Sequence, residues 1–259
     1  MIPVVKDILR VKESVSAMEK LGYESIGEYG MLFRHFFIKR EPGQFFNIHV
    51  FEENNPDIDR HLKFRDWMQT HLEDREAYEK LKINLASQFP NDIFGYVSGK
   101  DKFVESIDEK TGFDGIRAVL ALKNQEWDAV RNFRQKYFFD LVPIVDPYTW
   151  TFKDKQHAHI ILYKGIKIVG YAHIQFWPDK KAAMRIIVID EPYRNQGFGS
   201  ELLKICERWL KNQEIRILHV ESRLTSYPFY KRHKYIEMSF DDPEGHETHP
   251  NDIAIGKVL

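Results

Sequence analysis

A strand that runs into a glycine-containing loop and then into an amphipathic helix is the feature that most limits the fold of this chain. The segment reads "RIIVIDEPYRNQGFGSELLKICERWLK" and covers residues 185–211. The apolar start of this segment, together with the preceding Ala182, Ala183 and Met184, predicts a buried strand over residues 182–191. The helix is predicted over residues 200–211, and its buried face would consist of Leu202, Leu203, Cys206, Trp209 and Leu210.

The loop ahead of this helix is suited to hold an anion. The first amides of a helix have no acceptor within the helix, and the helix dipole favours negative charge there, as on a diphosphate. Gly197 and Gly199 let an anion approach the backbone where a side chain would block it. A tight strand-to-helix turn without a ligand is the alternative. The loop lacks the third glycine of a dinucleotide fingerprint and the Gly-Lys-Ser/Thr of a Walker loop.

Composition narrows the class of protein. The 259 residues are 43% hydrophobic and 30% charged, which suits one large or two ordinary globular domains. A net charge of −1 gives no electrostatic case for DNA or a membrane as partner. The single cysteine, Cys206, excludes an internal disulfide, and no Cys/His cluster has zinc spacing. We expect a cytoplasmic protein, because the amino terminus lacks a leader pattern and no apolar run could span a membrane.

The first half is expected to form a small sheet followed by helices. Its predicted strands are residues 3–11, 33–40 and 45–53, with a turn at the "EPGQ" of residues 41–44. Its predicted helices are residues 12–22, 56–72, 74–90 and 100–112. The second of these helices should have one apolar face made of Ile58, Leu62, Phe64, Trp67 and Met68. We place a domain boundary after Gly112, where the last helix ends.

The second half, residues 113–259, alternates strands and helices, so the whole chain is expected to be α/β (α+β). Two antiparallel strands are predicted within residues 157–177, with a turn at Lys164-Gly165. Further strands are predicted at residues 215–222, 235–238 and 252–259. Further helices are predicted at residues 128–138 and 226–233.

The sequence "RNQGFG", residues 194–199, resembles the Gln/Arg-x-x-Gly-x-Gly/Ala signature of the GNAT acetyltransferases. The strand–loop–helix context is similar, as is the strand followed by Phe229-Tyr230 on a short helix. The resemblance covers residues 113–259 and implies a mixed-sheet acyl-CoA N-acyltransferase domain with acetyl-CoA as cosubstrate and an amine-bearing acceptor. The residues that it assigns to acetyl-CoA are Val188, Ile189, Arg194, Asn195, Gln196, Gly197, Phe198, Gly199 and Ser200.

The same resemblance suggests catalytic roles. A splayed strand before the loop offers a backbone N–H to the acetyl carbonyl, and by position this is Val188 or Ile189. Tyr230 stands where the family's tyrosine protonates the coenzyme A sulfur, although it could instead only pack against the last strands. A base is needed because an acceptor amine is mostly protonated near pH 7. No family motif marks this base, and Glu221 is the preferred candidate because it lies at the end of the strand predicted over residues 215–222, beside the expected splay.

Other titratable groups of the second half are weaker candidates. No motif supports a role as base for His173, Asp190 or Glu191. His219 is expected to be a buried strand residue, and Cys206 is expected in the core and not as a nucleophile. No metal is expected.

Residues 1–110 resemble the GrpB family, which has a nucleotidyltransferase-like fold, most clearly in "HLKFRD" and "GKDKF". That family opens with a further strand and helix carrying Gly-Ser, and with an acidic residue, and this sequence starts after both. Because these groups seat a triphosphate and Mg²⁺, we expect a catalytically incomplete domain. An exposed sheet edge would favour a homodimer. The basic and imidazole side chains of this half are expected to form either an anion pocket or a solvated face of a strand and a helix. They are Arg34, His35, His49, Arg60, His61, Lys63 and Arg65.

Three functions follow from these observations. The first is an N-acetyltransferase that acts by direct attack in a ternary complex and carries an inactive nucleotidyltransferase-like domain. The second is a non-catalytic coenzyme A-binding module whose first half recognises a nucleotide or an RNA end, although the near-neutral charge argues against strong RNA binding. The third is a bifunctional enzyme with active nucleotidyl transfer.

Overall fold

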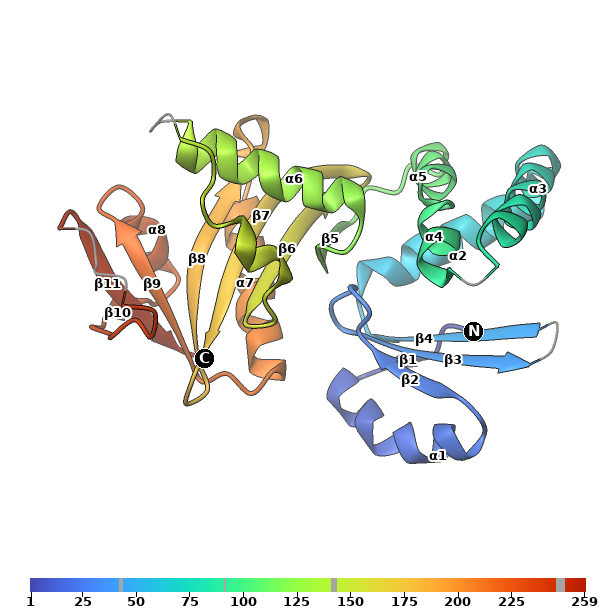
Figure 1. The fold of residues 1–259 in the computed structure, drawn as a ribbon, viewed down its shortest axis with the longest axis horizontal. Coiled ribbons are helices and arrows are strands. Elements are labelled where there is room, and N and C mark those ends of the chain that lie inside the picture. The colour runs from blue at the N-terminus through green and yellow to red at the C-terminus, as the bar shows by residue number, and fades with distance from the viewer. Residues whose placement is uncertain (42–43, 91, 141–143, 246–249) are drawn as a thin grey trace. The chain divides into compact units, whose positions relative to one another are not determined.

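The computed structural model describes residues 1–41, 44–90, 92–140, 144–245 and 250–259. They form two compact units, described separately below (Figure 1). The first consists of residues 1–117 together with 163–168, and the second of residues 118–162 and 169–259. The boundary after Gly112 stays a prediction.

The first unit contains a four-stranded sheet in the order β1-β4-β3-β2. The strands are β1 (Val4–Val5), β2 (Glu24–Gly27), β3 (Arg34–Glu41) and β4 (Gln44–Glu52). The predicted hairpin of β3 and β4 is confirmed, with Arg34 opposite Phe51 and Glu41 opposite Gln44. Pro42 and Gly43 of its predicted turn lie outside the described residues.

The strand predicted over residues 3–11 is wrong beyond Val5. The carboxylate of Asp7 accepts a hydrogen bond from the Leu9 amide at 2.9 Å and starts the 3₁₀ helix η1 (Ile8–Ser14). Helix α1 (Val15–Lys20) follows. Ile8 and Val11 of η1 pack into a core against Phe37 and Val50 of the sheet.

The first five residues lie along β4. The amides of His49, Phe51 and Glu53 donate to the carbonyls of Met1, Pro3 and Val5 at 3.1, 3.0 and 2.8 Å. Strand β1 is therefore an outer strand of this sheet, and a homodimer through an outer strand stays a prediction.

Four helices complete the first unit, and Figure 1 shows them on the side of its sheet opposite to α1. They are α2 (Pro56–Thr70), α3 (Leu72–Gln88), α4 (Ile93–Ser98) and α5 (Asp101–Lys110), of which α4 was not predicted. The five apolar residues predicted to form one face of α2 are all partly buried, and the fully buried residues of this helix are Asp57 and Arg60. Arg60 Nε donates to Asp108 of α5 at 2.7 Å, and Nη1 lies 3.6 Å from Asp57. A buried ion pair thus bridges helices α2 and α5.

The second sheet has seven strands in the order β10-β11-β9-β8-β7-β6-β5. Strands β8 and β9 are parallel, whereas β7 pairs with β8, β11 with β9 and β10 with β11 in antiparallel fashion. The strands are β5 (Ile116–Leu120), β6 (His157–Lys164), β7 (Lys167–Trp177), β8 (Lys181–Ile189), β9 (Ile217–Arg223), β10 (Ile236–Glu237) and β11 (Asp252–Val258). The predicted turn at Lys164-Gly165 is confirmed, and β5 was not predicted.

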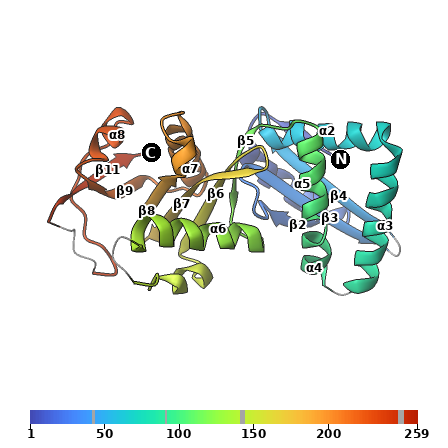
Figure 2. The same cartoon turned by 90° about the horizontal axis from the view of Figure 1, so that it is seen from above.

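Helices cover both faces of this sheet (Figure 2). Helix α6 (Asn124–Arg134) packs on one face, where Phe133 meets Tyr171 of β7 at 6.2 Å between ring centroids. Helix α7 (Phe198–Asn212) packs on the other, where Trp209 meets Phe176 of β7 at 5.8 Å. Because side chains alternate along a strand, β7 directs Tyr171, His173, Gln175 and Trp177 to the α6 face.

The remaining helices are short. They are η2 (Gln135–Phe139), η3 (Thr149–Lys153), η4 (Glu191–Tyr193) and α8 (Tyr227–Arg232). Helix α7 begins at Phe198, two residues before the predicted start, and its predicted apolar face is confirmed as buried.

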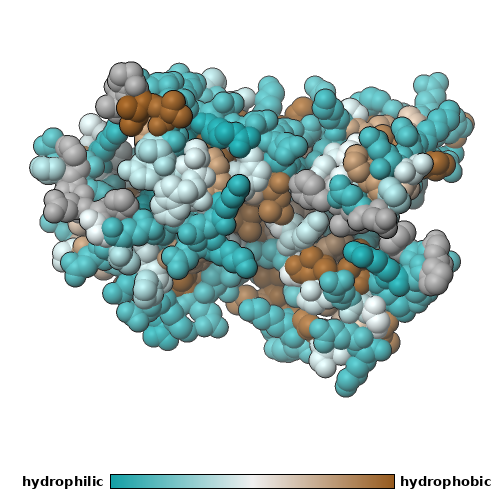
Figure 3. All heavy atoms as spheres, in the orientation of Figure 1, coloured by the Kyte–Doolittle hydropathy of each residue, from teal (hydrophilic) through white to brown (hydrophobic). Residues whose placement is uncertain are grey.

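The surface that faces the viewer in Figure 3 is mostly hydrophilic, with scattered hydrophobic patches. Among the described residues, the helices are all too short or too polar to cross a lipid bilayer.

Candidate active site

The parallel pair β8–β9 comes apart in the middle of the sheet. Pairing runs from Lys181 opposite Ile217 to Met184 opposite Val220 and then stops. Strand β8 continues to Ile189 and β9 to Arg223 without further pairing to each other among the described residues. We call the space between these two strand ends the β8–β9 gap.

The hydrogen-bond pattern of β8 shows which amides face this gap. The Asp190 amide donates to the carbonyl of Val169 in β7 at 2.9 Å. Because successive amides of a strand alternate in direction, Val188 also faces β7, whereas Ile187 and Ile189 face the gap. Of the two predicted donors, Val188 is therefore directed away from the gap and Ile189 toward it. Ile187 was missed, because the direction of its amide depends on the register of β7 with β8.

The glycine loop continues directly from this strand end. Asn195 and Gly197 have left-handed backbones, with φ of 59° and 87°. Within the described part of the chain, the amides of residues 195–200 donate to no other backbone group, and the first helical bond runs from the Glu201 amide to the Gly197 carbonyl at 3.0 Å. A side chain built on Gly197 would meet nothing within 4 Å. The loop thus combines unsatisfied donors with open space, which fits a diphosphate.

The side chains of the loop brace its own backbone. Arg194 Nε donates to the Ile189 carbonyl at 3.0 Å, and its guanidinium lies 4.9 Å from the centroid of the Tyr137 ring. Gln196 Nε2 donates to the Pro192 carbonyl at 2.8 Å. The contribution of both side chains to a bound anion would therefore come through the shape of the loop.

The next turn of α7 is fixed in a similar way. Phe198 is buried and contacts Tyr193 edge-on at 6.1 Å between ring centroids. Ser200 Oγ lies 2.9 Å from Nε2 of His233, which follows α8. Gly199 has room for a side chain, since an added Cβ would lie 3.7 Å from Ile189 and Phe229.

Tyr230 of α8 is buried, with an exposed fraction of 5%. Its ring packs edge-on against Tyr235, with 5.3 Å between centroids. Burial, with a smaller contribution from the Cys206 thiol, raises the pKa of the phenol far above its ordinary value. Tyr230 therefore keeps its proton near pH 7, and both its packing role and the predicted acid role remain compatible with these contacts.

Glu221 lies on β9 just beyond the last residue that pairs with β8. Its side chain is partly exposed. His219 pairs with Ala183, which stands opposite Gln175 of β7, so alternation puts His219 and Glu221 on the α6 face. A carboxylate at this position borders the gap from the face opposite to α7.

The weaker candidates for the base are engaged elsewhere. His173 is buried, and burial together with the neighbouring His159 and Arg134 holds its pKa well below the ordinary value. Asp190 accepts hydrogen bonds from Tyr137 and, at 3.1 Å, from Lys136. Both ring nitrogens of His173 take part in hydrogen bonds, to Arg134 and to His157, so neither is directed at a substrate.

A buried polar network surrounds His173 on the α6 face. Arg134 binds Asp146 through two hydrogen bonds of 2.5 and 3.0 Å. His173 Nε2 lies 2.9 Å from Nδ1 of His157. His159 Nδ1 lies 2.7 Å from the Tyr171 hydroxyl.

In the first unit, the predicted basic residues do not form one solvated face. Arg34 is buried and donates to the carbonyls of Glu28 and Tyr29, at 3.0 and 2.9 Å from Nη2. Its Nη1 lies 3.1 Å from Nδ1 of His49, whose pKa burial and Arg34 lower to about 3. Arg60 is buried in its pair with Asp108. The prediction of a solvated face is therefore wrong for Arg34 and Arg60. Arg65 is exposed and pairs with Asp66.

Comparison with known proteins agrees with this geometry. Residues 121–235 match the acetyltransferase (GNAT) family, a class of domain that binds acyl-CoA and whose presence implies acyl-CoA-dependent acetyltransferase chemistry. Residues 1–110 match the GrpB protein family. The chain is a GrpB domain followed by a GNAT acetyltransferase domain.

One curated relative is UPF0157 protein YqkA of Bacillus subtilis (strain 168), 32% identical over 133 residues, or 49% of this chain and 39% of the relative. The chain spans only 39 to 56% of the lengths of the first curated relatives that it matches. A putative N-acetyltransferase from Lactobacillus plantarum is 17% identical, with a TM-score of 0.48 over 56% of this chain and 99% of that one. The conserved protein GrpB from Enterococcus faecalis is 28% identical, with a TM-score of 0.37 over 42% of this chain and 66% of that one.

Proposed function

We propose that this protein is an acetyl-CoA-dependent N-acetyltransferase that moves an acetyl group to a primary amine by direct attack in a ternary complex. The observation that carries the proposal is that the β8–β9 gap and the loop of unsatisfied amides lie at the same end of β8. The gap begins after the pair of Met184 and Val220. The amides of residues 195–200 belong to the loop that follows the end of β8 at Ile189. One extended ligand can therefore use both.

The backbone would hold the donor. The amides of residues 195–200 donate to the pyrophosphate, and hydrogen bonds to charged groups contribute about 1.5–3 kcal/mol each. Gly197 leaves the space that the diphosphate needs. When bound, acetyl-CoA supplies the activated thioester. The Ile189 amide, or that of Ile187, donates to the acetyl oxygen as it gains negative charge, and a preorganised donor of this kind lowers a barrier by about 3–4 kcal/mol.

Two side chains would handle protons. Glu221 attracts the acceptor ammonium, whose pKa of about 10.4 keeps it mostly charged near pH 7, and takes up its proton directly or through water. Tyr230 donates a hydrogen bond to the departing sulfur. Because burial raises the pKa of Tyr230 above that of a thiol, the phenol stabilises the thiolate more than it transfers its proton.

The GrpB domain is proposed to be a catalytically inactive, nucleotidyltransferase-like domain. In support, the guanidinium groups of Arg34 and Arg60 are buried and bonded inside the domain, which removes them from a role at a triphosphate. A domain of this kind would contribute structure or recognition.

Calorimetry with acetyl-CoA on the full chain, followed by thiol release with a panel of primary amines, tests the proposal. We expect binding and turnover with at least one amine. Binding without turnover would instead identify a non-catalytic coenzyme A module, and absence of binding would refute the assignment of the loop.

A further inference from the structure

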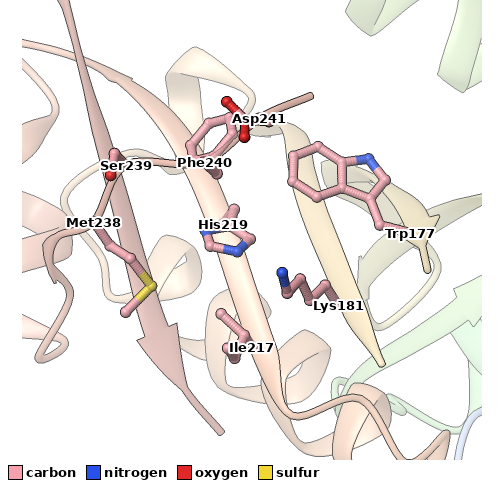
Figure 4. Close-up of a pocket in the computed structure, with 8 residues that line it drawn as sticks. All are labelled: Trp177, Lys181, Ile217, His219, Met238, Ser239, Phe240 and Asp241. Atoms are coloured by element: carbon pink, nitrogen blue, oxygen red, sulfur yellow. The ribbon is translucent and has the colours of Figure 1, made fainter. Parts of the chain in front are cut away.

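The GNAT domain contains a pocket of about 310 Å³ whose walls include none of the residues assigned above (Figure 4). This volume is at the small end of the range for ligand sites, which begins at about 300 Å³. Three strands and the segment after β10 form the walls. A pocket of this size takes a molecule with a single ring or a short chain.

The pocket adjoins the β8–β9 gap. His219 in its wall pairs with Ala183, one residue before the last pair of Met184 and Val220. Glu221 follows His219 by two residues, so it points to the same face about 7 Å further along the strand. Trp177 and Lys181 stand opposite each other on β7 and β8, also on the α6 face. A molecule in the pocket would therefore extend from Lys181 toward the gap.

Aromatic rings make up the middle of the pocket. His219 lies 5.5 Å from Trp177 and 4.9 Å from Phe240 between ring centroids, and Trp177 lies 5.4 Å from Phe240. Trp177 and His219 are 7% and 3% exposed. Burial, with a smaller contribution from Lys181, lowers the pKa of His219, so this ring is neutral near pH 7. The neutral rings offer contact to an apolar body.

The two ends of the pocket carry opposite charges. Figure 4 shows the Lys181 amine pointing toward His219 from one end, while the Asp241 carboxylate lies beyond Phe240 at the end nearer the gap. Among the described residues, Lys181 has no carboxylate within ion-pair distance, in contrast to its neighbour Lys180, which binds Glu214 at 2.7 Å. An unpaired ammonium beside aromatic rings is a binding group for an anion.

We propose that this pocket recognises the acceptor, and that the acceptor is an amine that carries a carboxylate at the other end of an apolar body. Its carboxylate binds Lys181, its body packs against Trp177 and Phe240, and its amine points past Asp241 to Glu221 at the gap. This inference rests on the proposed acetyltransferase function.

Binding without acetyl-CoA tests the recognition step. Calorimetry on the full chain would compare phenylacetate, phenylacetamide and phenethylamine, which share one ring and differ in the charge of the end group. We expect phenylacetate to bind about tenfold more tightly than the amide, the low end for a charge-assisted hydrogen bond. Lys181→Met should remove this preference, and the control Lys180→Met should keep it. Equal binding of the three compounds by the wild type would overturn the proposal.

Kinetics test the acceptor role. Para-(aminomethyl)phenylacetate carries both end groups, and para-methylbenzylamine lacks the carboxylate. We expect the KM of the first to be about tenfold lower, and Lys181→Met to abolish the difference with no change in the KM of acetyl-CoA. Equal KM values for both amines in the wild type would refute the role of the pocket but would leave the acetyltransferase function standing. Anion-selective binding with no transfer to any amine would refute the acetyltransferase, and the acceptor role with it.

Discussion

Arg134 donates a hydrogen bond from Nη1 to Nδ1 of His173, over 3.2 Å. A guanidinium has donors only, so Nδ1 of His173 accepts and the ring carries its proton on Nε2. That proton points at Nδ1 of His157, 2.9 Å away, which must also accept. One arginine thus fixes the tautomers of two buried histidines, and a second proton on either ring would place donor against donor.

Acid should therefore destabilise the GNAT domain from about pH 6.5 downward. Burial lowers the pKa of His157, His173 and His159, the last to about 3. Between the folded and unfolded pKa values only the unfolded chain binds the proton, so stability falls as the pH falls, by up to about 1.4 kcal/mol per pH unit for each ring. Urea unfolding between about pH 5 and 7.5 measures this slope.

One variant isolates the contribution of one buried ring. His159→Asn should flatten the slope by the share of one proton relative to the wild type. Equal slopes in His159→Asn and the wild type would show that His159 is not neutral in the folded protein.

Gly197→Ala should weaken acetyl-CoA binding by about tenfold or more. The new Cβ would occupy space that is now open, at the point where the proposed diphosphate would approach. Any side chain at a φ of 87° also strains the backbone, by about 1–2 kcal/mol. Gly112→Ala is a matched control, because Gly112 has a φ of 62° and equally open surroundings far from the loop in sequence. If the calorimetric affinity for acetyl-CoA fell equally in both variants, backbone strain and not the blocked approach would explain the loss, and the prediction would be contradicted.

Tyr230→Phe should lower kcat by about tenfold or less, with an unchanged affinity for acetyl-CoA. In the proposed mechanism the hydroxyl acts only as the carbon–sulfur bond breaks, so its loss would affect the transition state and not the bound ground state. Tyr235→Phe is the control, since Tyr235 is a buried neighbour in contact with the same ring. Single-turnover rates would decide the point, and equal rates for all three proteins would leave Tyr230 a packing residue.

Asp108→Ala should destabilise the GrpB domain by about 3–5 kcal/mol, because it leaves the Arg60 guanidinium buried with one distant partner, Asp57. Asp59→Ala removes an exposed pair with Lys63 on the same helix α2 and should cost less than about 1 kcal/mol. Hydrogen exchange of peptides from α2 and α5, read by mass spectrometry, reports this locally. Similar exchange in both variants would contradict a buried pair that stabilises the domain.

The loop could be predicted from the sequence because its determinants are local. The strand, the two glycines and the amphipathic helix are contiguous in residues 185–211, and the folded chain keeps that order. The hairpin of β3 and β4 was predictable for the same reason. Alternation and turn residues act over a few positions, so a sequence read in short windows contains them.

Contacts between distant segments could not be predicted in this way. Arg60 and Asp108 are 48 residues apart, and each alone looks like a solvated charge. The choice of Ile189 over Val188 depends on the register of β8 with β7. The pocket brings together Trp177, His219 and Phe240 from three separate segments, and no local pattern marks them.

If the proposed donor binds in the β8–β9 gap, the early end of pairing between β8 and β9 links the stability of the fold to that ligand. Two interior strands of a seven-stranded sheet each present backbone donors and acceptors that a neighbouring strand would normally satisfy. A bound molecule with amide groups of its own can take the place of that neighbour and become, for as long as it stays, part of the sheet. At a ligand concentration about one hundred times Kd, such binding adds about 2.7 kcal/mol to the free energy of unfolding. Resistance to proteolysis would then follow the supply of the proposed donor, so that the abundance of the protein would report the concentration of that donor.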